Sequence, residues 1–88
     1  MSAISRAEGA YSETEIDQEV VVMNLESGDF FSLTGTARAI WRLIDGTRDR
    51  DALLAELASE FAAAPAEIAA DLDPFLEALA AAGLIVRR

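Results

Sequence analysis

Hydrophobic positions cluster in two short runs in the first third of the chain and recur at helical spacing afterwards. The runs Val20–Met23 and Phe30–Leu33 flank a polar stretch that contains Gly28. β-Branched and aromatic residues at this density favour strands, and a glycine between two such runs favours a turn. The pattern therefore predicts a β-hairpin over residues 20–33. It also predicts a short first strand at Tyr11–Ile16, followed by a turn at Asp17-Gln18.

The turn geometry sets the register of this hairpin. If Glu26 and Ser27 form a type I turn, Gly28 occupies the following left-handed position, where the absence of a Cβ matters. A two-residue turn would shift the register by one. We expect the three-residue loop, because it gathers large side chains on one face and turns Phe30 away from the core. That core face pairs Met23 with Phe31 and Val21 with Leu33.

Apolar residues at spacings of three and four predict three helices after the hairpin. The expected helices span about residues 34–45, 50–62 and 65–83. Thr34 is the expected N-cap of the first, Asp49 or Thr47 caps the second, and Pro65 suits the first turn of the third. Pro74 interrupts the third helix but the apolar spacing continues across it, so we expect one bent helix. The expected buried stripes are Ala37, Ile40, Trp41 and Ile44, then Leu53, Leu54, Leu57, Ala58 and Phe61, then Ile68, Leu72, Phe75, Leu76 and Leu79.

The order of elements predicts the fold class. It is an α+β fold with an N-terminal three-stranded antiparallel sheet followed by three α-helices, similar to a winged helix-turn-helix with the sheet first. Residues 1–10 show no period and are expected to form a loose tail, which leaves residues 11–88 as the folded domain. Leu84–Val86 leaves the third helix as a short extended segment.

Composition narrows the classes of function. The 88-residue chain carries a net charge of −9 and has no Lys, and residues 1–33 hold seven acids against Arg6 alone. This balance disfavours nucleic acid, which needs clustered basic residues. The absence of Cys and His excludes disulfides, thiolate metal sites and His-dependent nucleophiles. The chain has no apolar run of membrane-spanning length and no signal-peptide pattern. We expect a cytoplasmic, non-catalytic domain without a cofactor or metal.

The strongest candidate site is the second arm of the hairpin, Phe30–Leu33. Its hairpin partner pairs with one side only, so the other side is able to pair with an extended peptide. The structural alternatives are an edge shielded by the third helix and a Phe30 covered by the N-terminal segment. On the third helix, Asp71 lies beside Ile68, Leu72 and Phe75, as a simple solvated acid or as the acidic rim of a groove.

Several short motifs occur in a definite order along the chain. They are the hairpin Asn24–Ala37 with its aromatic pair, then Ile40-Trp41, then Leu43-Ile44-Asp45-Gly46, then the spaced Leu54, Leu57 and Phe61, and finally Asp71-Leu72, Phe75-Leu76, Leu79 and Gly83-Leu84-Ile85. Together, over about residues 12–86, they resemble the PqqD family. No single motif is specific to that family, and the ordered set carries the resemblance.

The resemblance implies a module that binds the leader of a ribosomally made, post-translationally modified precursor peptide. It implies capture of the leader as a strand added to the third strand of the sheet, against the third helix, and presentation to a maturation enzyme such as a leader peptidase or a radical SAM enzyme. Carried over to this sequence, the peptide-binding residues are Asp29, Phe30, Phe31, Ser32, Leu33, Ile68, Asp71, Leu72 and Phe75. Within the family, the aromatic pair and the Ile-Trp pair favour lasso-peptide or other peptide pathways over pyrroloquinoline quinone synthesis.

Two other hypotheses remain at this stage. One is a DNA-binding winged helix, for which Arg38, Arg42, Arg48 and Arg50 would be the basic cluster, although acids surround them. The other is a weak homodimer in which the free edges of two copies pair, against the expectation of a monomer.

Overall fold

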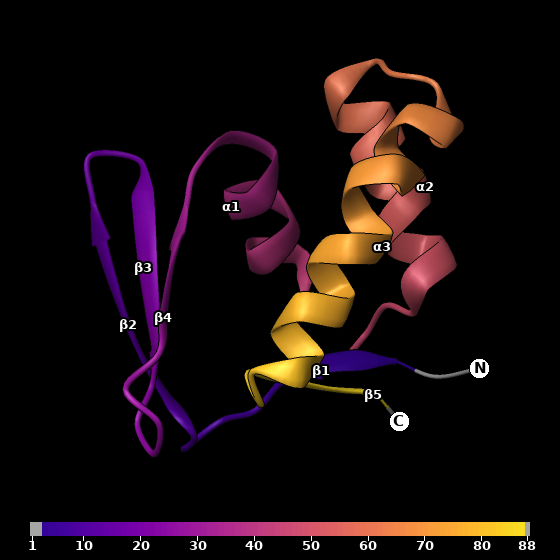
Figure 1. Ribbon diagram of the computed structural model, residues 1–88. Helices are drawn as coiled ribbons and strands as arrows, with labels where there is room; N and C mark the ends of the chain where they lie inside the picture. Colours follow the sequence, from indigo (N-terminus) through magenta and orange to yellow (C-terminus); the bar gives the residue numbers. More distant parts are fainter. Residues whose placement is uncertain (1–2, 88) are drawn as a thin grey trace.

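The computed structural model describes residues 3–87, and its sheet and helices follow one another along the chain (Figure 1). The strands are β1 (Ile4–Arg6), β2 (Tyr11–Ile16), β3 (Glu19–Asn24), β4 (Phe30–Leu33) and β5 (Ile85–Arg87). The helices are α1 (Gly35–Leu43), α2 (Arg50–Phe61) and α3 (Pro65–Ala81). Strands β2, β3 and β4 form an antiparallel sheet in that order, and β1 pairs with β5. The predicted α+β class, a three-stranded sheet followed by three helices, is confirmed.

The first hairpin follows the sequence closely. Strand β2 has the predicted bounds, and Ile16 pairs directly with Glu19 across a two-residue turn. Both turn residues have positive φ, 49° at Asp17 and 68° at Gln18. Two left-handed residues in succession are the geometry whose twist matches a tight antiparallel hairpin, and Asp is among the residues that tolerate it.

The second hairpin has a different register from the predicted one. Strands β3 and β4 pair Val22 with Phe31 and Val20 with Leu33, so the loop is four residues long rather than three. A one-residue slip turns every side chain of a strand to the other face. Val20 and Val22 are therefore in the core, and the predicted core residues Val21 and Met23 lie on the opposite face. The inward direction of Phe31 and Leu33 and the outward direction of Phe30 were predicted correctly.

The side chain of Asn24 explains the longer loop. Its Oδ1 accepts hydrogen bonds from the backbone N–H groups of Glu26 (2.8 Å) and Ser27 (2.9 Å). The backbone carbonyl of Asn24 accepts from Gly28 N–H at 2.9 Å. An Asn side chain that accepts hydrogen bonds from the backbone of its own turn competes with strand pairing for the N–H groups of the following residues. Leu25, which was predicted to pair with Asp29, is consequently held in the loop with Glu26, Ser27 and Gly28.

The expectation of a loose tail over residues 1–10 does not hold for β1. Ile4–Arg6 pairs antiparallel with Ile85–Arg87 at the other end of the chain, and the side chain of Ile4 is only 1% exposed. The backbone N–H of Ile4 also donates to the carbonyl of Arg48 at 2.8 Å. A three-residue strand is too short to show an alternation of hydrophobic and polar residues, and its partner is distant in sequence. No local pattern therefore predicts it. Met1 and Ser2 lie outside the described residues.

Trp41, on α1, connects the sheet to the helices through its side chain. Its side chain is fully buried, and its indole N–H donates to Glu13 Oε1 on β2 at 2.8 Å. The ring of Tyr11 meets it edge-on with centroids 5.3 Å apart, and the guanidinium of Arg6 lies 5.0 Å from the ring centre. Arg6 also donates to the carbonyl of Trp41 at 3.0 Å. Aromatic, cation–π and hydrogen-bond contacts therefore join β1, β2 and α1 at one residue.

Helix α2 begins after Asp49, one of the two residues predicted as its cap. The carboxylate of Asp49 accepts a hydrogen bond from Ala52 N–H at 2.8 Å, which satisfies one of the free donors of the first turn. Leu53 and Leu57 are buried, as the stripe predicts, but Phe61 is 42% exposed. Phe61 is the last residue of the helix, and the chain leaves the core there through Ala62, which has φ 50°.

Helix α3 runs without interruption through Pro74, which confirms the predicted continuity, and Gly83 follows it at φ 75°. The predicted bend at Pro74 stays a prediction. Arg50, the first residue of α2, contacts α3 next to Pro74. Arg50 donates to both oxygens of Asp73, from Nε at 2.9 Å and from Nη2 at 2.8 Å. This two-bond contact holds the pKa of the Asp73 carboxyl below its usual value and raises the pKa of Arg50. No helix within residues 3–87 is long and apolar enough to cross a membrane.

The first prediction concerns β1. Ile4→Ala is expected to lower the free energy of unfolding by about 2–5 kcal/mol, because it removes a fully buried side chain. Ile16→Ala is the matched control: this side chain is 61% exposed, and its loss is expected to cost less than about 0.5 kcal/mol. Urea denaturation of both variants measures the difference. Equal stability of the two variants would mean that β1 is not part of the folded unit.

The second prediction concerns pH. The folded-state pKa of Asp73 lies below its unfolded value, so its ionised form stabilises the fold above the unfolded pKa. That contribution disappears as the pH falls through the folded pKa. Asp73→Asn is therefore expected to be less stable than the parent protein at pH 7, with a difference that shrinks below about pH 4. Asp71→Asn, an exposed neighbour on α3, is the control. Thermal unfolding at pH 7, 4 and 3 tests this, and a pH-independent difference contradicts it.

Candidate functional site

Strand β4 is an edge of the sheet. The strand order in this sheet is β2-β3-β4, so among the described residues β4 has a neighbouring strand on one side only. Asn24 N–H donates to the carbonyl of Asp29 at 2.8 Å, which fixes the alternation of hydrogen-bonded pairs along the hairpin. Phe31 and Leu33 consequently direct their backbone groups at β3. The N–H and C=O groups of Phe30 and Ser32 point outward, where an added strand would meet them.

The side chains of the predicted edge residues fall into two groups. Those of Phe31 and Leu33 point inward, with Leu33 buried and Phe31 half-buried against the core. Those of Phe30 and Ser32 point outward: Phe30 is 68% exposed, and the Ser32 hydroxyl donates to the carboxylate of Glu19. Asp29 is exposed at the start of the strand.

The four predicted site residues of α3 differ in how far their side chains are exposed. Ile68 and Leu72 are buried in the core, so their side chains support the fold rather than a surface. Asp71 is exposed, and Phe75 is half-buried and packs on the same core as Phe31. Phe75 and Phe31, from α3 and β4, are thus the two predicted aromatic residues that lie at the boundary between core and surface.

Sequence reasoning missed the junction between the hairpin and α3. Asn24 Nδ2 donates to the carbonyl of Ala82, the C-cap of α3, at 2.7 Å. A Cβ added at Gly83 would come within 3.3 Å of the same Nδ2, so the chain passes close to the turn. A shallow pocket lies here, lined by Ser27 and Asp29 from the turn and by Ala82 and Gly83 from the helix end. The signal in the sequence was an Asn directly before a glycine-bearing loop.

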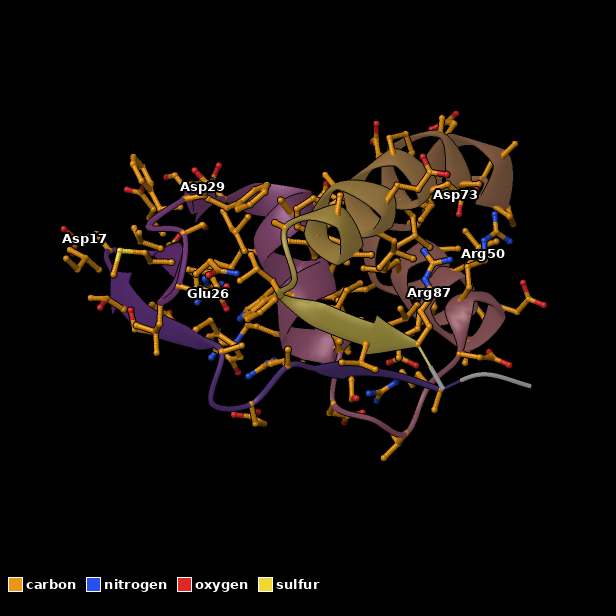
Figure 2. The ribbon with its side chains drawn as sticks, turned by 60° about the horizontal axis from the view of Figure 1, so that its bottom comes forward. Asp17, Glu26, Asp29, Arg50, Asp73 and Arg87 are labelled. Carbon is orange, nitrogen blue, oxygen red and sulfur yellow. The ribbon has the colours of Figure 1, made fainter. Side chains whose placement is uncertain are left out.

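Among the described residues, some acids form ion pairs with arginines, whereas acids at the hairpin turns do not. The arginines on or flanking β1, α1 and α2 are paired with acids: Arg6 with Glu13, Arg38 and Arg42 with Glu15, Arg48 with Asp45, and Arg50 with Asp51 and Asp73. Hydrogen bonding from Arg38 lowers the pKa of Glu15. Figure 2 shows Asp17, Glu26 and Asp29 on the sheet side and Arg50, Asp73 and Arg87 together at the other end. Within residues 3–87, these three sheet-side acids form no ion pair.

The candidate site offers main-chain groups for binding along the edge of β4. Within residues 3–87, His, Cys, Asp and Glu do not gather in any group of three that would hold a metal ion. What the edge of β4 offers is main-chain donors and acceptors beside half-buried aromatic side chains. Such an edge is able to accept an extended peptide by backbone pairing.

Comparison with known proteins agrees with this fold. The family described as "Coenzyme PQQ synthesis protein D (PqqD)" matches residues 19–85, and the chain belongs to this family. A solved structure, "TbiB1 in Complex with the TbiA(beta) Leader Peptide", superposes with a TM-score of 0.77 at 28% sequence identity. The match covers 89% of this chain and 91% of that one. No curated protein matches the sequence. The resemblance expected from the ordered motifs is therefore confirmed.

The third prediction separates the two roles of Asn24. Asn24→Asp keeps an oxygen for the N–H groups of Glu26 and Ser27 but replaces the donor to Ala82 with a second acceptor. Loss of that bond beside a carbonyl is expected to cost about 1–3 kcal/mol of unfolding free energy. Hydrogen exchange should quicken at Gly83 and Leu84 while the Gly28 amide in the turn stays protected.

Asn24→Ala is the matched control for this prediction. It removes both contacts, so exchange should quicken in the turn and at the end of α3 together. Protection of Gly83 that is unchanged in Asn24→Asp would show that the bond to Ala82 does not hold the two elements together.

Proposed function

We propose that this protein captures the leader of a ribosomally synthesised precursor peptide by adding it as a strand to β4, and that it presents the precursor to a maturation enzyme. The observation that carries the proposal is the unpaired edge at Phe30 and Ser32 in a PqqD-family fold. It is supported by the similarity to TbiB1, whose structure contains a leader peptide. No reaction is assigned to the chain itself, which acts by binding.

The geometry gives this proposal specific contacts. Phe30 and Ser32 each offer one N–H and one C=O, so the leader gains up to four main-chain hydrogen bonds. Leader side chains on the inner side of the added strand lie next to Phe31 and reach toward Phe75. Asp71 and Asp29 are the exposed acids among the predicted residues, and they favour a leader with basic side chains at its ends.

Within this function, we favour lasso-peptide synthesis or another peptide pathway, with a leader peptidase or a radical SAM enzyme as the partner. Pyrroloquinoline quinone synthesis is the alternative. A monomer or weak homodimer in the cytoplasm is the form we expect to act. Binding to DNA is disfavoured, because four of the arginines that would contact phosphate, Arg38, Arg42, Arg48 and Arg50, form ion pairs with acids.

The fourth prediction tests pairing with β4. A synthetic leader, encoded next to this protein, is N-methylated at one backbone position at a time. Each methyl group removes one N–H donor. Methylation should weaken binding about tenfold at every second residue of the paired segment, and little at the residues between them. Isothermal titration calorimetry of the series measures this pattern.

The alternation is the decisive feature of this series. In an added strand, neighbouring N–H groups point in opposite directions, so only alternate ones face β4. A leader that binds with no sensitivity at any position contradicts strand addition. Matched Cα-methylated or side-chain-substituted peptides at the sensitive positions, which keep the N–H donor, show whether the effect comes from the lost donor rather than from added bulk.

A further inference from the structure

The face of the sheet that points away from the helices carries exposed apolar side chains. Paired residues of adjacent strands point to the same side, so Met23 of β3 shares this face with Phe30 of β4, its direct partner. Val21 belongs to it by alternation along β3, and Ile16 by alternation along β2. Ile16, Met23 and Phe30 are 61%, 38% and 68% exposed. We call these four residues the outer apolar face.

This face lies next to acids that have no basic partner within residues 3–87. Asp17 lies in the turn next to Ile16, and Glu19 pairs with Ile16 across the strands. The ion pairs of the described residues involve other acids, on or next to β2, α1, α2 and α3. An apolar centre with an acidic border complements a protein surface with an apolar centre and an Arg or Lys border.

The same charges argue against a second copy of this chain on the outer apolar face. Two such faces in contact would bring Asp17 and Glu19 of one copy near those of the other. Like charges brought together at an interface cost free energy, and nothing on this face neutralises them. The complementary surface therefore belongs to a different protein.

The outer apolar face is continuous with the edge of β4. In the proposed function, the leader becomes the next strand, and alternate leader side chains join the outer face beside Phe30. A protein docked there touches Met23 and Phe30 on this chain and the leader side chains beside them. Its affinity then depends on whether the leader is in place.

We propose that the outer apolar face is the docking surface for the maturation enzyme, which contributes an apolar centre bordered by Arg or Lys and binds most tightly when a leader occupies β4. This inference rests on the proposed leader capture. The expected contacts with the enzyme are made by Ile16, Val21, Met23 and Phe30, with Asp17 and Glu19 at the border.

The test uses the full chain, a synthetic leader and the purified maturation enzyme encoded with the precursor. Binding of the enzyme is measured by calorimetry with and without leader, for the parent protein and for Met23→Ser and Asp17→Asn. Phe61→Ser, which removes another exposed apolar side chain on α2, is the matched control. Circular dichroism verifies that each variant is folded, and Ile16→Ser replaces Met23→Ser should the latter unfold.

The expected results are specific to this face. The leader should tighten enzyme binding to the parent protein, and Met23→Ser should weaken it about tenfold. Asp17→Asn should flatten its dependence on salt. Phe61→Ser should change nothing, and the leader itself should bind Met23→Ser as it binds the parent.

Three results overturn the docking proposal. They are an enzyme that does not bind the parent protein with or without leader, an enzyme that binds Met23→Ser as tightly as the parent, and a homodimer in sedimentation that Met23→Ser abolishes. Failure of the leader to bind the parent protein is a different result. It removes the proposed function, whereas an effect of Met23→Ser on the enzyme alone would leave the docking face standing.

Discussion

The burial of one tryptophan decides where the sheet sits. Trp41 contacts β1 through Arg6 and β2 through Tyr11 and Glu13, while its own helix α1 packs against β4. The indole N–H is a donor that cannot be left unpaired in a core, and Glu13 supplies its acceptor from the sheet. A second attachment, from Asn24 to Ala82, holds the hairpin to the end of α3. Between these two points the edge of β4 is held at a defined place beside the helices.

Local patterns in the sequence predict most elements of the fold. The Asp-Gln turn, the strand limits at Tyr11 and Ile16, the Asp49 cap and the passage of α3 through Pro74 all follow from neighbouring residues, and all were predicted. The register of the second hairpin was not, because the Asn24 side chain lengthens the loop by capping it. A glycine alone does not distinguish a three-residue loop from a four-residue one.

Contacts between distant parts of the chain were beyond sequence reasoning. Strand β1 has only three residues, and its partner β5 lies some eighty positions away. For the candidate site, the free edge of β4 followed from its place in the hairpin, and the exposure of Phe30 followed from the face assigned to the large side chains. The burial of Ile68 and Leu72 followed from their helical stripe. The half-buried position of Phe75 did not, because a stripe identifies the inward face of a helix without showing which residues of that face remain at its border.

The shortness of β4 limits what main-chain pairing is able to contribute. Two outward-facing residues provide at most four hydrogen bonds, each with a net value of about 0.5–1.5 kcal/mol. Together these bonds contribute about 2–6 kcal/mol. Immobilising a free peptide costs roughly 4–15 kcal/mol, which exceeds that gain over most of its range. Backbone pairing on so short an edge therefore determines the direction and alignment of an incoming chain. Side-chain contacts outside this backbone pairing therefore have to supply the binding affinity and the specificity for one peptide sequence over another.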